Sequence, residues 1–231
     1  MKKSEFSEKF FEFTVNHELL NKYNVDIYIP SQYEEDDLGW DIGFTDYHQL
    51  YFFQYKIVQK YDRNPIGLIG DSYKFDLHKN SRGVFKQHNL LRSLNAMGFI
   101  ARYVVPDYIE INTLKKLLYS NNVFSKVRFI TPGILSTKRS HYINFDSTQV
   151  FQHSKDQVKL ETSPLNEIFE YADYAIVKDW TVDKQKLLQT IREDSILMTI
   201  NKDANEDVLI NKYLYTNKII MIALKGKKDD Q

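Results

Sequence analysis

Cysteine is absent from this 231-residue chain, which excludes disulfides and thiolate metal sites. Its six histidines form no His-x-x-x-His or His-x-His pair, which argues against a zinc hydrolase. No apolar run approaches the roughly 18 residues that a membrane span needs, and the first residues lack the apolar core of a signal peptide. We therefore expect a cytoplasmic protein that has no membrane partner.

The overall composition is ordinary for a folded, water-soluble chain. Hydrophobic residues make up 42% and charged residues 27% of the sequence. The length suits one large domain, or a domain with an appendage, and is sufficient for a sizeable core.

The formal net charge of zero conceals a separation of charge along the chain. Residues 1–76 carry 8 basic and 14 acidic side chains, residues 77–145 carry 11 and 2, and residues 146–231 carry 12 and 15. A basic middle beside an acidic start suits a protein that holds phosphates with cations and a metal ion with carboxylates. The candidate nucleic-acid contacts are Arg82, Lys86 and Arg92. The alternative is that the basic segment docks on the protein's own acidic segments or on an acidic partner.

Two apolar segments contain polar side chains where strands are expected. Residues 40–44 carry Asp41, and residues 50–58 carry Gln54 and Lys56. Because side chains alternate across a strand, Gln54 and Lys56 share one face, and the other face is entirely apolar. Residues 46–49 predict a turn, and the resulting hairpin would bring Asp41 near Gln54 and Lys56. Burying such groups is costly unless they pair or bind a metal, so the alternatives are a metal site and an Asp41–Lys56 salt bridge on an edge hairpin.

This arrangement resembles the active-site strands of the restriction-endonuclease-like, or PD-(D/E)xK, nucleases, in the variant in which Gln replaces the second acid. The resemblance covers roughly residues 5–145. It implies that Asp41 is the central metal-binding acid, that Gln54 offers the metal a neutral oxygen, and that Lys56 positions or activates the attacking water. It also implies a further acid, for which Glu35, in a Glu-x-x-Leu-Gly-x-Asp pattern, and Glu12, in the first helix, both remain candidates.

The same resemblance implies an α/β fold with a mixed central sheet flanked by helices. The implied activity is that of a Mg²⁺- or Mn²⁺-dependent DNA endonuclease acting in restriction or anti-phage defence. Its implied partners are DNA and either a second copy of the chain or another protein of a defence complex. The alternative is a catalytically inactive nuclease-like fold that binds DNA or a protein, for example as an inhibitor.

The rest of the chain predicts alternating helices and strands. Helices are expected over residues 4–23, 80–97, 113–119, 165–174, 183–199 and 203–215, and strands over 25–29, 99–105, 127–130, 141–145 and 218–224. Residues 60–80, which contain proline and glycines, predict a long surface excursion. In the first helix the expected core residues are Phe6, Phe10, Phe13 and Leu20. Gln87 resembles a glutamine that supports the active site in several branches of the nuclease superfamily.

Two parts follow from this pattern. We expect residues 1–150 to form the nuclease-like core. Residues 151–231 are expected to form a mostly helical C-terminal extension packed on that core.

Overall fold

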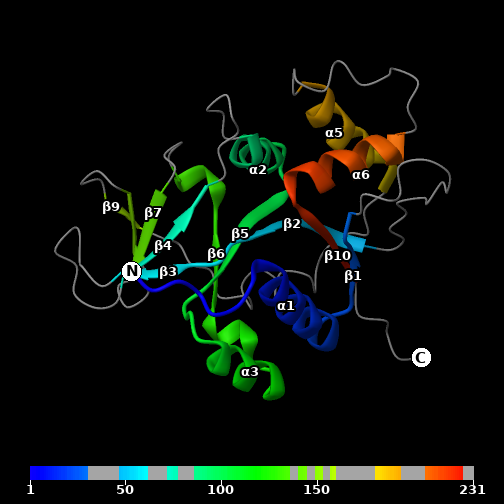
Figure 1. Ribbon diagram of the computed structural model, residues 1–231. Coiled ribbons are helices and arrows are strands. Elements are labelled where there is room, and N and C mark those ends of the chain that lie inside the picture. Colours follow the sequence, from blue (N-terminus) through cyan, green and yellow to red (C-terminus); the bar gives the residue numbers. More distant parts are fainter. Residues whose placement is uncertain are drawn as a thin grey trace.

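A computed structural model of the protein describes residues 1–30, 47–61, 72–77, 86–135, 140–144, 149–152, 157–159, 180–193 and 206–225. The described part is a mixed α/β structure with two five-stranded sheets and helices on both faces of the larger one (Figure 1). The helices are α1 (Glu8–Lys22), α2 (Lys86–Ala96), α3 (Ile111–Tyr119), α5 (Trp180–Glu193) and α6 (Glu206–Asn217), with short 3-10 turns η2 (Val123–Lys126) and η3 (Pro132–Ile134).

The larger sheet has the strand order β1-β10-β2-β5-β6. Its strands are β1 (Val25–Tyr28), β10 (Ile220–Lys225), β2 (Tyr47–Tyr55), β5 (Ile100–Pro106) and β6 (Val127–Ile130). Strand β2 runs parallel to β5 and antiparallel to β10, so the sheet is mixed. The expected mixed α/β class and the strands expected at 25–29, 99–105, 127–130 and 218–224 are confirmed.

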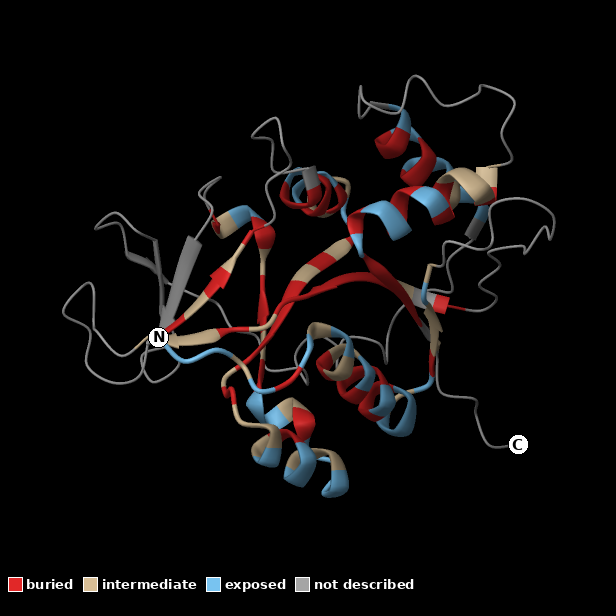
Figure 2. Cartoon of the chain, viewed as in Figure 1, coloured by how far each residue is buried: buried red, intermediate tan, exposed pale blue. Residues whose placement is uncertain are grey.

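Alternation along β2 divides the core into two layers, one on each face of the sheet. Leu50 and Phe52 pack with residues of α2, α5 and α6, whereas Tyr51, Phe53 and Tyr55 pack with residues of α1 and α3. Figure 2 shows the central strands largely buried between these helices, with residues of intermediate burial at the start of β5. The large aromatic side chains of β2 anchor both layers, since full burial of one such side chain stabilises a fold by about 1.5–3 kcal/mol.

The turn expected at residues 46–49 is wrong for its described part, because β2 already begins at Tyr47. Over residues 51–53, β2 has β10 on one side and β5 on the other, so no hairpin partner pairs with it there. A register shift opposite Leu224 and Lys225 marks a bulge in β2. The extra residue explains why Tyr47 is buried in the same layer as Leu50, three positions later.

The second sheet contradicts the expected surface excursion at residues 60–80. Its strand order is β3-β4-β7-β8-β9, and all pairs are antiparallel. The strands are β3 (Gln59–Tyr61), β4 (Ser72–Asp76), β7 (Ser140–Asn144), β8 (Gln149–Gln152) and β9 (Gln157–Lys159). Phe75 and Leu77 are buried against the layer that contains α2, which ties this sheet to the main core.

The C-terminal region is part of the main sheet and not only an extension packed on it. Strand β10 lies between β1 and β2 and forms ladders with both. Helices α5 and α6 agree with the expected helical character, while the helix expected over 165–174 lies outside the described residues. A boundary at residue 150 therefore does not separate the sheet from the C-terminal region.

The first helix is present, but its buried face differs from the expected one. The helix begins after Ser7, whose hydroxyl accepts a hydrogen bond from the Phe10 amide, and not at Ser4. Phe6 is buried as expected, but Phe13 and Leu20 are each 57% exposed. The buried apolar residues of α1 are Phe11, Val15 and Leu19. Both stripes are apolar, so periodicity alone did not distinguish them.

Candidate functional site

Gln54 and Lys56 lie at the C-terminal end of β2, in the middle of the main sheet. Gln54 is 1% exposed and Lys56 is 9% exposed. The ladder to β5 continues past the strand, because the Lys56 amide donates to the Val104 carbonyl oxygen at 3.0 Å. The main chain thus holds both residues in place, and the expectation that two polar side chains enter an apolar environment is confirmed.

The side-chain amide of Gln54 is oriented by the end of α6. Its Nε2 donates to the main-chain oxygen of Asn217 at 3.2 Å. Only the NH₂ group can donate to a carbonyl, so this contact fixes which side-chain atom is oxygen. Gln54 Oε1 is buried and has no hydrogen-bond partner among the described residues. A buried acceptor without a donor costs about 1–3 kcal/mol, so this oxygen is positioned to accept a donor or bind a cation.

The Lys56 ammonium lies among charged groups at the start of α1 and the end of α6. Its Nζ is 4.0 Å from Glu8 Oε2. Burial lowers the pKa of Lys56, Glu8 opposes that change, and Lys218 adds to it. Lys218 directly follows Asn217 and adopts a positive φ of 53°. The turn after α6 therefore places Lys218 near Lys56, and Asn217 against Gln54. A lysine with a lowered pKa and a nearby carboxylate is typical of functional sites.

The acids expected at this site have different outcomes. Asp41 and Glu35 lie outside the described residues. Glu12 forms an ion pair with Lys9 at 2.9 Å and adds to the raised pKa of Tyr55, whose side chain is on the opposite face of β2 from Phe52. The first helix instead directs Glu8 to Lys56.

Glu8 was not among the expected site residues. It lies one helical turn before Glu12, and side chains four apart share a helix face, so the sequence did contain a usable signal. What the sequence could not show is that Glu8 in the first turn of α1 lies near Lys56, whereas Glu12 in the next turn lies near Tyr55.

Buried polar groups continue from Gln54 toward α2. Tyr103 on β5 pairs in register with Gln54, and its hydroxyl lies 3.0 Å from His88 Nδ1. The His88 side chain is buried, and burial followed by the Arg92 charge lowers its pKa from 6.5 to about 4, against a raising effect of the Leu135 main chain. Neutral His88 can accept a hydrogen bond from the Tyr103 hydroxyl.

Gln87, the glutamine expected to support the site, precedes His88 on α2. It is 6% exposed, and its Oε1 is buried without a hydrogen-bond partner within the described segments. Gln87 is therefore a second buried amide on the helix that follows β2 and packs against the sheet layer of Phe52. The sequence also allowed Gln87 to be an ordinary surface residue, and its burial shows that this alternative is wrong.

The expected nucleic-acid contacts are only partly described. Arg92 is exposed on α2. Arg82 lies outside the described residues. Lys86 is the first residue of α2, and only its main chain is described. The basic middle segment does not form one face, because α2 and α3 cover opposite faces of the main sheet. Two of its arginines serve internal contacts: Arg102 donates to Asn95, and Arg128 pairs with Asp107.

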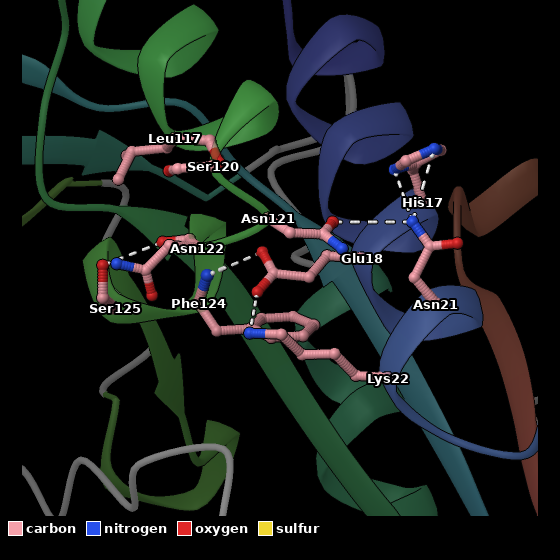
Figure 3. A network of polar contacts seen from close by, with 10 residues as sticks. All are labelled: His17, Glu18, Asn21, Lys22, Leu117, Ser120, Asn121, Asn122, Phe124 and Ser125. Carbon is pink, nitrogen blue, oxygen red and sulfur yellow. Dashed lines mark hydrogen bonds and ion pairs between the residues drawn. The ribbon is translucent and has the colours of Figure 1, made fainter.

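A polar network joins α1 to the segment after α3, on the face of the sheet opposite Phe52 (Figure 3). The buried Glu18 carboxylate accepts a hydrogen bond from the Phe124 amide at 3.1 Å and forms an ion pair with Lys22. Asn21 donates to Asn121 at 3.5 Å. These contacts are satisfied within the protein, so the network fixes α1 against η2 and has a structural role.

The described residues form neither a metal site nor a membrane-spanning helix. Among them, no group of three or more His, Asp and Glu side chains is placed to hold a metal ion. None of the helices in this part of the chain is long and apolar enough to cross a membrane. Gln54 Oε1 and the Glu8 carboxylate are oxygen donors of the kind that Mg²⁺ prefers, but the described residues alone do not form a metal site.

No protein-family model matches this sequence, and no curated protein or solved structure is significantly similar to the chain.

Proposed function

We propose that the protein is a Mg²⁺- or Mn²⁺-dependent DNA nuclease whose active site is built on the end of β2. The observation that carries this proposal is the pair of buried polar side chains there. Gln54 uses its amide nitrogen for Asn217 and leaves its oxygen unpaired within the described part, and the buried Lys56 follows two residues later, with its Nζ 4.0 Å from Glu8 Oε2. The unpaired, buried oxygen is available to accept a donor or to bind a cation.

The course of the chain supports a contribution from Asp41 or Glu35. Strand β1 runs in the same direction as β2, because both are antiparallel to β10. Tyr28 is level with Met221, which is level with Phe52, so the chain leaves β1 at the same end of the sheet as Gln54. It returns at Tyr47, at the opposite end. The described chain therefore leaves β1 at the Gln54 end of the sheet and enters β2 at the opposite end.

Each residue of the proposed site has a distinct role. Asp41, with Glu35 or Glu8, would hold the metal ion through carboxylate oxygens, and Gln54 Oε1 would add a neutral oxygen. The metal, when bound, supplies Lewis-acid chemistry at the phosphate. Lys56 would steady the attacking water or the charge that develops on the phosphate. Gln87 and the His88–Tyr103 pair form the buried polar wall toward α2.

A second candidate is a nuclease-like fold without catalytic activity that binds DNA or a protein. One observation favours it: Gln54 is held by the end of α6, so the neutral amide also has a structural use. We further propose that the protein acts in restriction or anti-phage defence in the cytoplasm, together with a second copy of the chain or another protein.

Plasmid nicking by the purified chain in Mg²⁺, Mn²⁺ and EDTA tests the proposal. Wild type should nick only with a divalent ion, and Asp41→Ala and Lys56→Ala should each lose activity by about a hundredfold to a thousandfold. Lys56→Ala should retain most of its DNA affinity, because one buried ammonium contributes little to phosphate binding. Glu12→Gln is the matched control for Glu8→Gln, since only Glu8 contacts Lys56.

Two outcomes would overturn the nuclease assignment. Equal nicking by wild type and Asp41→Ala would place the activity elsewhere. Intact DNA binding with no cleavage by any variant would favour the inactive fold.

A further inference from the structure

The outer surface of α3 carries two basic side chains and an exposed aromatic ring, and the helix contains no acid. Lys115, Lys116 and Tyr119 are exposed on one side of the helix, and Leu114 is buried on the other. Residues three and four apart share a helix face, so the two lysines flank the tyrosine ring. We call these three residues the α3 face. Figure 2 shows the outer side of α3 exposed at the edge of the molecule.

Most other described lysines form an ion pair with an acid, and the two lysines of the α3 face do not. Lysines on α1 and α5 form ion pairs, for example Lys9 with Glu12 and Lys186 with Asp183. Lys115 and Lys116 form no ion pair with any described residue, and residues 111–145 contain no acid at all. The α3 face is therefore positively charged without an internal counterion in this part of the chain.

Tyr119 adds a second, independent feature. Its side chain is 87% exposed, the highest value among the large exposed hydrophobic residues. An exposed aromatic ring beside lysines is the pairing used to bind single-stranded nucleic acids, in which bases stack on rings and phosphates contact cations. In a duplex the bases are already stacked on each other, so the ring would have nothing to stack on.

The α3 face is connected to the proposed active site. The Ile111 amide, at the start of α3, donates to the Glu5 carboxylate at 3.1 Å. Glu5 lies three residues before Glu8, which contacts Lys56. The start of α3 is therefore bonded to the segment that leads into α1, the helix that also contacts Lys56.

We propose that the α3 face binds a single-stranded nucleic acid, with Lys115 and Lys116 contacting phosphates and Tyr119 stacking on an unpaired base. The proposal deepens the nuclease function, on which its choice of substrate rests. The substrate would then be a single strand, or a duplex with a single-stranded end, and not an uninterrupted duplex.

Fluorescence anisotropy with labelled oligo(dT) in EDTA measures this binding without cleavage. Lys115→Gln/Lys116→Gln should lower affinity and reduce the dependence of log K on log salt by about 0.7 per lysine. Tyr119→Ala should weaken binding by about tenfold, while Tyr119→Phe, which keeps the ring, should not. Arg192→Gln is the matched control, because Arg192 is also exposed on a helix but lies on α5.

Several results would overturn the inference. The first is an unchanged oligo(dT) affinity in the α3 variants, and the second is an equal loss of affinity for oligo(dT) and for a hairpin duplex in the lysine variant, with no effect of Tyr119→Ala. The third is that the α3 variants lose affinity only for vesicles that contain phosphatidylserine. The fourth is that only Arg92→Gln loses affinity for oligo(dT). The last result would move the binding surface to α2.

The two proposals can fail separately. If wild type cleaves and the α3 variants bind as tightly as wild type, only the α3 assignment fails. If the α3 variants lose affinity for oligo(dT), and neither wild type nor any variant cleaves plasmid DNA, only the nuclease assignment fails.

Discussion

Gln54 on β2 and Asn217 at the end of α6 are 163 residues apart in sequence, and the Gln54 amide donates to the Asn217 main-chain oxygen at 3.2 Å. This bond joins the candidate site to the C-terminal region. It turns Gln54 Oε1 away from Asn217 and leaves it without a donor within the described structure. The residues that end α6 and begin β10 thus orient a residue of the proposed site.

Gln54→Glu tests this bond directly. A carboxylate cannot donate to the Asn217 oxygen and would place a buried negative charge beside it, so without metal the variant should lose about 1–3 kcal/mol of unfolding free energy. Mg²⁺ should restore more stability to Gln54→Glu than to wild type. Thermal unfolding in EDTA and in Mg²⁺ measures both effects, with Gln54→Leu as the control that lacks the charge. Equal stability of wild type and Gln54→Glu in EDTA would contradict the observed orientation.

Lys56→Met should stabilise the protein at neutral pH while abolishing cleavage. Burial lowers the pKa of Lys56 below its usual 10.5, so the folded state holds the charge at a cost that methionine removes. We expect a gain of about 0.5–2 kcal/mol, as is common when a functional site is relieved of strain.

The pH dependence of that gain has a defined sign. Between the lowered pKa of folded Lys56 and 10.5 the unfolded chain binds more protons, so wild-type stability rises with pH relative to Lys56→Met. The difference between the two proteins should therefore shrink as the pH rises through this window. Denaturant unfolding at several pH values measures it, and Lys115→Met, at an exposed position, should show no gain. A Lys56→Met protein less stable than wild type at pH 7 would show that the ion pair with Glu8 outweighs burial.

His88 should make the fold sensitive to acid. Its pKa is about 4 in the folded protein and 6.5 when unperturbed, so stability is fully present above pH 6.5 and is lost as the pH falls toward 4. The total loss is about 3 kcal/mol. The variant His88→Gln can still accept a hydrogen bond from the Tyr103 hydroxyl, and it should flatten the dependence of stability on pH. Urea unfolding at pH 4 to 7 tests this expectation, and the exposed-helix variant His17→Gln should keep the wild-type slope.

Removal of β10 should prevent folding of the main sheet. A chain that ends at Asn217 loses the ladders to both β1 and β2 and exposes the buried side chains of Met221 and Ile222. We expect no cooperative thermal transition and rapid proteolysis. A chain that ends at Lys225 keeps every ladder of β10 and should unfold like wild type. A cooperative transition in the shorter chain would show that residues 1–150 fold without the C-terminal strand.

Local patterns in the sequence were sufficient for several elements. Alternation in residues 50–55 correctly divided β2 into two buried faces, and the strands ending at Pro106 and Ile130 were expected from their apolar runs and turn residues. The burial of Gln54 and Lys56 also followed from their place in the most apolar run of the chain. These features depend on neighbours within a few residues, so the sequence contains them directly.

Choices between similar local options needed the tertiary structure. Helix α1 carries two apolar stripes, and its packing on β2 and α3 decided that Phe11 and Leu19 are buried while Phe13 and Leu20 are exposed. In the same way, the crossing of α1 over the end of β2 decided that Glu8, and not Glu12, contacts Lys56.

The sequence by itself determined the α/β class, most of the described strands of the main sheet, and the presence of a polar pair in a buried strand. The tertiary structure alone decided that β10 enters between β1 and β2, that Asn217 orients Gln54, and that the basic residues divide between two faces. The physical reason is that strand order and contacts between distant segments depend on the free energy of packing the whole chain, which no local window of residues encodes.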